Sequence, residues 1–464
     1  MPNFIQSPLN FHPVDGLTVR ASFDGGSMSS DFGAILMRET ALQSQLLTKL
    51  AAAISDSRRQ THIKHSMQDL ITQRTIQLAC GYEDANDSNS LRKDPMFKLA
   101  LGKKPLDEEQ DLAHGSTFTR LGQNVDSKDL YRMAQAFIDH FMDSYSKDPS
   151  IIILDMDHTE DQVYGQQELA LFNRYYGHYG YLPLTIFEGF SGKLIGTYLR
   201  PGKRPTGAEN AMIMKRVIQQ IRSRWANVHI VLRGDGHFSN PELMQLSQDD
   251  DNMDFIFGVP GNKALSPMAS SLLTAAKHCL DEKRHNAKLV GQPEPYKVRL
   301  YDELDYKAKS WMGIECRLIV KAEVNLLGKN PRYIVTSITN ASPETLYCDF
   351  YCARGQDENF IKQLKNDMAC DRTSDQGFLA NQLRLFYSAA AYVLMHEFRL
   401  ETLKGTVLER AEMGTIRLKL FKIAVRIVQY KDRVKLMLPS SCPVSELLKR
   451  VTDILYSSRL LKPG

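Results

Sequence analysis

Residues 151–157, with the sequence IIILDMD, decide the fold class of this chain because a strongly apolar run ends in two acids. A continuous aliphatic run rich in β-branched residues predicts a strand that is buried on both faces. Alternation along a strand places Asp155 and Asp157 on the same face. A carboxylate at the end of a buried strand is costly unless it is paired or binds a metal. The segment therefore predicts an α/β sheet with a polar site at the strand end.

A second segment repeats this design. Residues 228–236 (VHIVLRGDG) predict another buried strand that runs into Asp235. Together with Glu358, which lies on a predicted helix, Asp157 and Asp235 would form a three-carboxylate cage for Mg²⁺, because hard divalent cations prefer oxygen ligands. Two such ions can activate a nucleophile and steady the leaving oxygen in phosphoryl transfer. Asp155 is a fourth candidate ligand, which leaves the identity of the first acid open.

One predicted helix carries residues with the spacing Y-x2-R-x3-E-x6-K: Tyr351, Arg354, Glu358 and Lys365. At about 100° of rotation per residue they fall within an arc of roughly 60°. One helix face would therefore carry an acid flanked by two cations and a phenol. Such a face suits a metal-binding carboxylate beside a phosphate backbone. The same spacing also fits a solvated face with ordinary charge pairs.

Other interpretations of the acids stay open at this point. Asp157 fits a cap or an Asx-turn, and the Asp-Gly pair at 235–236 is a common turn dipeptide. Residues 155–159 (DMDHT) also fit the first motif of haloacid-dehalogenase-like phosphatases. In such an enzyme Asp155 would be the nucleophile and Asp157 the general acid/base. The late Gly-Asp-x3-4-Asp motif of those enzymes is missing after residue 235.

Several stretches resemble the DDE transposases of bacterial insertion sequences, in the group that carries the Y-x2-R-x3-E-x6-K signature. Within that group the chain is similar to the insertion-sequence family numbered thirteen-eighty. The resemblance starts near Phe23 and continues into the region 423–439, so it covers most of the chain. Besides the signature, the matching stretches are LDMDHTEDQVYGQQ (154–167), YLPL (181–184), LRPG (199–202) and RGDGHF (233–238).

The resemblance implies an RNase H-like catalytic core interrupted by a β-rich insertion. It places the three catalytic and metal-binding acids on Asp157, Asp235 and Glu358. Side chains that contact DNA near the transposon end would be Tyr351, Arg354 and Lys365. In resembling enzymes an aromatic residue of the insertion stacks on a flipped base, and here Trp311 is the candidate, although core packing explains a tryptophan there equally simply.

The resemblance also implies an enzyme that cuts and rejoins DNA at the terminal inverted repeats of an insertion sequence. The cofactor would be two Mg²⁺ ions, with Mn²⁺ able to substitute. The partners would be double-stranded DNA, at transposon ends and target, and a second copy of the chain in a synaptic dimer. Hairpin formation at the DNA end is expected by analogy. A catalytically inactive, transposase-derived DNA-binding protein is the alternative, although the acids are intact.

Three regions are expected along the chain. Residues 1–145 would be a mainly helical DNA-binding and dimerisation region. Residues 146–400 would be the catalytic domain, with the β-rich insertion at about 265–345. Residues 401–464 would be a small C-terminal region, with a hairpin and a helix, that contacts DNA or the dimer partner.

Composition sets wider limits. A hydrophobic content of 43% and a charged content of 24% are typical of a folded globular protein. No apolar stretch reaches 18 residues and no secretory signal is visible at Met1–Phe4, so we expect a cytoplasmic, nucleoid-associated protein without membrane contact. The seven cysteines are scattered, which indicates reduced, structural thiols.

Charge distribution says more than the net charge of +4. Basic residues gather in three runs, each of which fits either phosphate contacts or a solvated surface. We favour DNA contacts for the first and last: Arg58, Arg59, His62, Lys64 and His65; Arg200, Lys203 and Arg204; and Arg417, Lys419, Lys422, Arg426, Lys431, Arg433 and Lys435.

Overall fold

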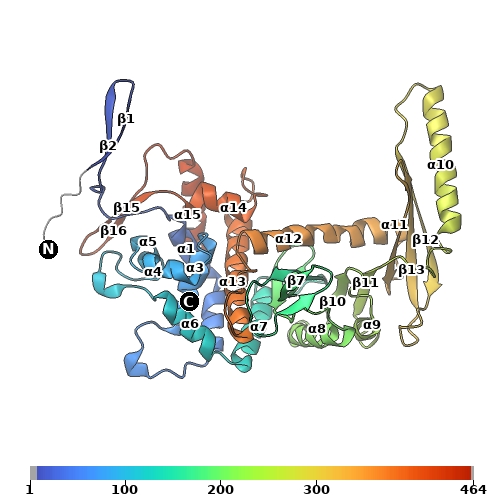
Figure 1. Ribbon diagram of the computed structural model, residues 1–464, viewed down its shortest axis with the longest axis horizontal. Coiled ribbons are helices and arrows are strands. Elements are labelled where there is room, and N and C mark those ends of the chain that lie inside the picture. The colour runs from blue at the N-terminus through green and yellow to red at the C-terminus, as the bar shows by residue number, and fades with distance from the viewer. Residues whose placement is uncertain (1–7, 461–464) are drawn as a thin grey trace. The chain divides into compact units, whose positions relative to one another are not determined.

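The computed structural model describes residues 8–460 and divides into two compact units (Figure 1). One unit comprises the chain up to Asp129, residues 363–372 and the chain from Phe386 on; the other comprises residues 130–362 and 373–385. The N-terminal and C-terminal regions expected from the sequence thus share a unit. Residues 1–4, where the sequence shows no secretory signal, lie outside the described residues. So do residues 461–464 at the end of the expected C-terminal region.

The second unit is built on an eight-stranded mixed sheet, which confirms the α/β class. Its strand order is β12-β13-β14-β11-β10-β4-β8-β9. The three central strands are parallel to one another, and every other neighbouring pair is antiparallel. The strands are β4 (Ile151–His158), β8 (Leu184–Glu188), β9 (Leu194–Tyr198), β10 (His229–Gly234), β11 (Met253–Val259), β12 (Lys297–Tyr306), β13 (Cys316–Asn325) and β14 (Gly328–Thr336).

The two faces of this sheet bury different side chains. On one face Ile152, Leu154 and Met156 of β4 join a large apolar cluster with the helices. These helices are α7 (Ser127–Asp143), α8 (Gly207–Arg222), α9 (Pro241–Gln248) and α10 (Ser270–Leu289). On the other face Ile153 belongs to a smaller cluster with Leu346 and Tyr347. Strand alternation puts Asp155 and Asp157 on this second face, as predicted.

The stretch expected to be a β-rich insertion contains the three strands β12, β13 and β14. They extend the central sheet, because β14 pairs antiparallel with the parallel strand β11. Helix α10 runs along these outer strands (Figure 1). The insertion therefore enlarges the same core.

A small sheet that the sequence did not predict lies between β4 and β8. Its three antiparallel strands have the order β5-β7-β6. They are β5 (Asp161–Gln162), β6 (Leu171–Asn173) and β7 (His178–Tyr181). The strands are only two to four residues long, too short for a period-two pattern to reveal them.

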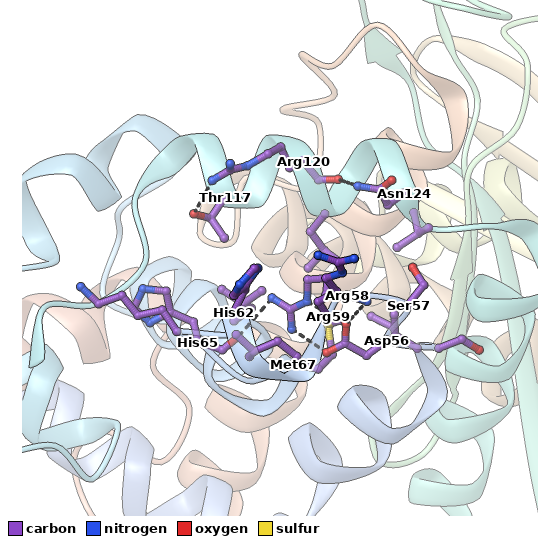
Figure 2. Close-up of a pocket in the computed structure, with 17 residues that line it drawn as sticks. Asp56, Ser57, Arg58, Arg59, His62, His65, Met67, Thr117, Arg120 and Asn124 are labelled. Atoms are coloured by element: carbon purple, nitrogen blue, oxygen red, sulfur yellow. Dashed lines mark hydrogen bonds and ion pairs between the residues drawn. The ribbon is translucent and has the colours of Figure 1, made fainter.

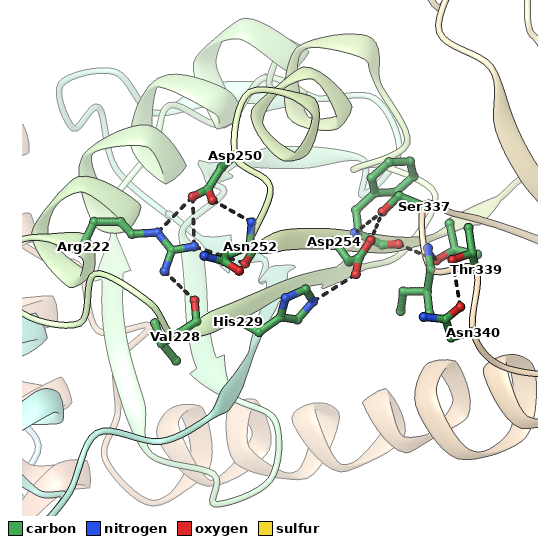
Figure 3. A network of polar contacts seen from close by, with 12 residues as sticks. Arg222, Val228, His229, Asp250, Asn252, Asp254, Ser337, Thr339 and Asn340 are labelled. Carbon is green, nitrogen blue, oxygen red and sulfur yellow. Dashed lines mark hydrogen bonds and ion pairs between the residues drawn. The ribbon is translucent and has the colours of Figure 1, made fainter.

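A polar network joins the amino ends of β10 and β11 to the chain after β14 (Figure 3). His229 contacts Asp254 with an Nε2–Oδ2 distance of 2.9 Å, and the Ser337 hydroxyl donates to the other carboxylate oxygen at 2.6 Å. Nearby, Arg222 donates from Nε to Asp250 at 2.9 Å. The serine donates to the aspartate and not to the histidine, so this is no nucleophilic triad. The network holds the strand ends opposite the acids.

The first unit is mainly helical. Its first two helices are separated at Gln45, whose φ of 59° is left-handed. Its helices are α1 (Gly33–Ser44), α2 (Leu46–Ala53), α3 (Met67–Ala79), α4 (Ser88–Leu91), α5 (Pro95–Ala100), α6 (Gly115–Asn124), α14 (Met413–Ile416) and α15 (Ser445–Leu460). Its strands are β1 (Leu9–Val14), β2 (Leu17–Ala21), β3 (Met28–Ser29), β15 (Val425–Gln429) and β16 (Val434–Met437).

Two long helices contain residues of both units: α12 (Gly355–Asn366) and α13 (Phe378–Thr402). The prediction of one α-helix through the whole signature is wrong. The chain forms the short helix α11 (Pro343–Thr345), a π-helical turn over Leu346–Tyr351 and a 3₁₀ turn over Cys352–Arg354 before α12 begins. The predicted arc therefore does not describe Tyr351 and Arg354. Across residues 8–460, no helix is long and apolar enough to cross a membrane.

Candidate active site

Two of the predicted acids lie beside each other at the carboxyl ends of neighbouring strands. Parallel strands β4 and β10 pair Asp155 with Arg233 and Met156 with Gly234. The next residue on each strand is Asp157 or Asp235, so the register itself brings the two acids together. Asp235 begins a turn, in which its carboxylate accepts the backbone N–H of His237 at 2.9 Å. The turn interpretation of Asp-Gly is thus correct as well.

The signature segment reaches the same strand ends. Nη2 of Arg354 donates to Oδ2 of Asp157 at 3.0 Å. Glu358 follows four residues later in the first turn of α12 and is exposed. Burial raises the pKa of Asp157 to about 6; the Arg354 guanidinium opposes that rise, and the charges of Asp235 and Glu358 add to it. Asp157 is therefore within electrostatic reach of both other predicted acids.

Asp155, the fourth candidate ligand, has a partner of its own. It is 1% exposed, and Arg233 on β10 binds both of its carboxylate oxygens, with Nη2–Oδ2 at 2.5 Å. Nη1 of the same guanidinium donates to the carbonyl of Phe350. Gly189 covers the pair so closely that a Cβ there would lie 2.6 Å from Nη2 of Arg233. Asp155 thus fixes the floor of the site.

The structure adds an acid that sequence reasoning missed. Asp357 is 1% exposed, and neither of its carboxylate oxygens has a hydrogen-bond partner within the described chain. Its pKa is raised to about 9. Burial is the largest cause, and the negative charges of Asp155 and Asp157 contribute in the same direction. The only indication of this acid in the sequence is its position next to Glu358 in a polar turn. Spacing alone could not show which of the two neighbours points inward.

The predicted DNA-contacting residues have different surroundings. Tyr351 lies against β11, where a Cβ on Gly258 would be 2.4 Å from its hydroxyl oxygen. Burial raises the pKa of the Tyr351 phenol, and the charge of Asp235 acts in the same direction. Lys365 lies in the last turn of α12, within the residues grouped with the first unit. Trp311 is 5% exposed and packs edge-on against Tyr306, so a base could reach its ring only after the segment moves.

The donor set fits hard divalent cations. Asp157, Asp235 and Glu358 offer only carboxylate oxygens, the ligands that Mg²⁺ and Mn²⁺ accept. Among residues 8–460, however, no three His, Cys, Asp or Glu side chains are gathered closely enough to hold an ion directly. Since Mg²⁺ keeps several of its waters and needs few protein ligands, an open arrangement of this kind is compatible with it.

A family model described as "Transposase DDE domain group 1" matches residues 11–460. The chain belongs to this family. It is accordingly a DNA transposase, an enzyme whose partner is DNA and whose family generally uses divalent metal ions. A search of curated proteins found no match. Among solved structures, a piggyBac transposase synaptic complex with hairpin DNA is similar at 11% identity and a TM-score of 0.41, over 84% of this chain and 80% of that one.

The buried pair under the transposase site gives a first prediction. Asp155→Ala leaves the Arg233 guanidinium buried without its carboxylate, and we expect it to lower the free energy of unfolding by roughly 3–5 kcal/mol. Asp157→Ala should cost less, because the side chains of the Arg354–Asp157 pair are 13% and 17% exposed, against 2% for each side chain of the Arg233–Asp155 pair. Urea denaturation of the two metal-free variants and the wild type measures both changes. Equal losses would contradict a structural role for Asp155.

Asp357 gives a second, pH-dependent prediction. Its folded pKa of about 9 lies above the ordinary value of 3.8, so its stabilising contribution is complete below pH 4 and is lost as the pH rises toward 9. Asp357→Asn removes this loss. We expect the metal-free variant to exceed the wild type at pH 8 by up to about 6 kcal/mol, since each pKa unit is worth about 1.4 kcal/mol, and to match it near pH 4. A variant less stable than the wild type at pH 8 would contradict the burial argument.

Proposed function

We propose that this transposase excises and reinserts an insertion sequence of the family numbered thirteen-eighty by cut-and-paste transposition at its terminal inverted repeats. Asp157, Asp235 and Glu358 are the proposed catalytic and metal-binding acids. The observation that carries the proposal is their convergence from β4, β10 and α12, since the charges of Asp235 and Glu358 both act on Asp157. Carboxylates whose pKa values are raised by burial and by neighbouring negative charges are concentrated at functional sites.

The strand order supports an RNase H-like core. Read from the edge, β9-β8-β4-β10-β11 holds the strands of this core in the order third, second, first, fourth and fifth. The first three are antiparallel, and the last two run parallel to the first. This is the order of three strands, helix, strand, helix and strand that the resemblance implies. It places the first acid on the central strand.

When bound, two Mg²⁺ ions, or Mn²⁺ in their place, would activate water for the first cut and the freed 3′-OH for strand transfer. The chain's own residues orient the substrate. Arg354, whose planar guanidinium suits bidentate phosphate contacts, lies at the catalytic acids. The Tyr351 hydroxyl, close to the backbone of Gly258, is placed to donate to a phosphate near the scissile position. Lys365 is the third proposed phosphate contact.

A basic groove in the first unit also supports DNA binding (Figure 2). It has a volume of about 530 Å³ and lies between the chain after α2 and helix α6. Its floor is apolar, with Ile54 and Leu121, and its rim includes Arg59, Lys64 and Arg120, all three exposed. Cations around a concave surface release counterions from phosphates on binding. The first basic run of the sequence is thus the preferred binding surface for the transposon end.

Each basic run contains a cation with a structural partner; in the first run, Arg58 pairs with Asp56 at 2.7 Å and is not counted among the DNA contacts. Arg200 is 6% exposed and pairs with Glu209 at 3.2 Å, and the guanidinium of Arg417 donates to the carbonyls of Ala79 and Asp367. These two arginines are therefore not counted among the DNA contacts. The synaptic dimer, the hairpin intermediate and the three functional regions of the chain remain proposals that rest on the resemblance.

The phosphatase interpretation is not supported. Its nucleophile would be Asp155, whose two oxygens are bound by Arg233 in a buried ion pair. A carboxylate held in this way cannot attack a phosphate ester.

The third acid can be tested directly. We expect Glu358→Gln to bind DNA that carries the ends of the encoding element but to produce no cleavage with Mg²⁺, because an amide replaces a proposed metal ligand. Asp357→Asn, the neighbouring control, should still cut. Cleavage and binding are read on gels with the same labelled duplex. Full nicking by Glu358→Gln would overturn the assignment, and loss of cutting only in Asp357→Asn would move the third acid to Asp357.

The groove can be tested by salt dependence. Arg59→Ala and Lys64→Ala should each weaken binding of a transposon-end duplex and reduce the slope of log K against log salt by about 0.9. Lys277→Ala is the control, since this exposed lysine already pairs with Asp281 at 2.9 Å. Fluorescence anisotropy at four salt concentrations measures the slopes. Unchanged slopes in both groove variants would show that the groove does not contact phosphates.

A further inference from the structure

The small sheet between β4 and β8 presents an aromatic surface beside the catalytic acids. Strand β5 begins at Asp161, four residues after Asp157. Several aromatic side chains of the small sheet and its turn are exposed to solvent: Tyr175 is 88% exposed, Tyr179 57% and Phe172 51%. Phe172 and Tyr179 meet edge-on at 5.4 Å, and Tyr175 meets Tyr176 at 4.9 Å. Large contiguous apolar surfaces in water usually mark an interaction site.

This surface rests on a rigid base. The hydroxyl of Tyr181, a buried residue of β7, donates to the carbonyl of Glu168 at 2.6 Å. The hydroxyl of Thr373 donates to Asp161 at 2.7 Å, so β5 is held from a distant part of the chain. A Cβ on Gly180 would lie 2.3 Å from the Asp161 carbonyl oxygen, which shows how closely the strands pack. The strands of the small sheet are thus held in place, and the turn between β6 and β7 carries Tyr175.

The surface is also close to the acids in electrostatic terms. Burial raises the pKa of the Tyr176 phenol, and the charge of Glu160 adds to this rise. Smaller contributions in the same direction come from Asp157 and Asp235. Glu160 in turn pairs with His178 on β7, which ties the chain directly after β4 to the aromatic strand. The small sheet therefore follows directly on β4, the strand that carries Asp157, and is tied to the chain after that strand by the Glu160–His178 pair.

We propose that residues 171–179 form a stacking platform for unpaired bases of the DNA strand held at the catalytic acids. The proposal rests on the proposed function and adds the part of the substrate that lies beside the scissile phosphate. Aromatic rings accept any base, because every base has a π-face. Arg174 is exposed between Phe172 and Tyr175, so a cation for the phosphates accompanies the rings. The buried Trp311 offers no such surface without a rearrangement.

Nucleic acid is the occupant that the surroundings favour. The platform continues from a site that must admit a DNA strand, and its cation complements a phosphate backbone. A second copy of the chain is the competing occupant. The two differ in a simple way, since a stacking platform discriminates between DNA with and without unpaired bases, whereas a protein interface does not.

The experiment compares a blunt duplex with the same duplex carrying a tail of four unpaired thymidines, using the full-length protein in EDTA. We expect the wild type to bind the tailed duplex at least about fivefold more tightly. Tyr175→Ala should lose this preference while binding the blunt duplex within about twofold of the wild type. Tyr175→Phe, which keeps the ring, should retain it. Tyr296→Ala is the control, as an exposed tyrosine of the same unit outside the platform.

Two outcomes would overturn the proposal. One is equal binding of the two duplexes by the wild type, or a preference that survives in Tyr175→Ala. The other is a loss of dimer mass by light scattering in Tyr175→Ala with the tail preference intact, which would make the surface a protein interface. Both readouts use metal-free protein and need no cleavage. They can therefore fail while the Glu358→Gln test succeeds, and the reverse also holds.

Discussion

The buried ion pair between Asp155 and Arg233 is the constraint on which the catalytic end of the sheet depends. Two charges that are 1% exposed are tolerated only in good mutual geometry, and here the guanidinium binds both carboxylate oxygens. The pair joins β4 to β10 in the register that sets Asp157 beside Asp235. The same guanidinium holds the carbonyl of Phe350, just before the signature. Three segments far apart in sequence are therefore fixed around one side chain.

Above this pair the acids converge at a cost in folding free energy. The raised pKa values of Asp157 and Asp357 mean that the folded chain pays a penalty for ionising them. The rest of the unit offsets this penalty with a large apolar cluster on the opposite face of the sheet. Departures from local stability rules of this kind are expected at functional sites. The unpartnered carboxylate of Asp357 is the clearest departure in the described chain.

The sequence predicted the parts of this arrangement that follow from local patterns. Apolar runs located β4 and β10, and their terminal acids located the site. It could not predict the Arg233 pairing, because that depends on the register between strands 78 positions apart. Nor could helical periodicity predict the π-helical and 3₁₀ turns before α12, which are set by tertiary packing of Leu346 and Tyr347. Burial of Trp311 likewise depends on strands that meet only in the folded sheet.

Arg354 links the state of the acids to the state of the substrate. In the protein alone its guanidinium neutralises Asp157 and moderates the repulsion from Asp235 and Glu358. The proposed role of the same group is to hold a phosphate, and one guanidinium in this geometry cannot fully satisfy both partners. A strand that draws Arg354 away would leave Asp157 with uncompensated negative charge, which favours cation binding at that moment. On the proposed roles, substrate binding and assembly of the metal site would be coupled through this single side chain.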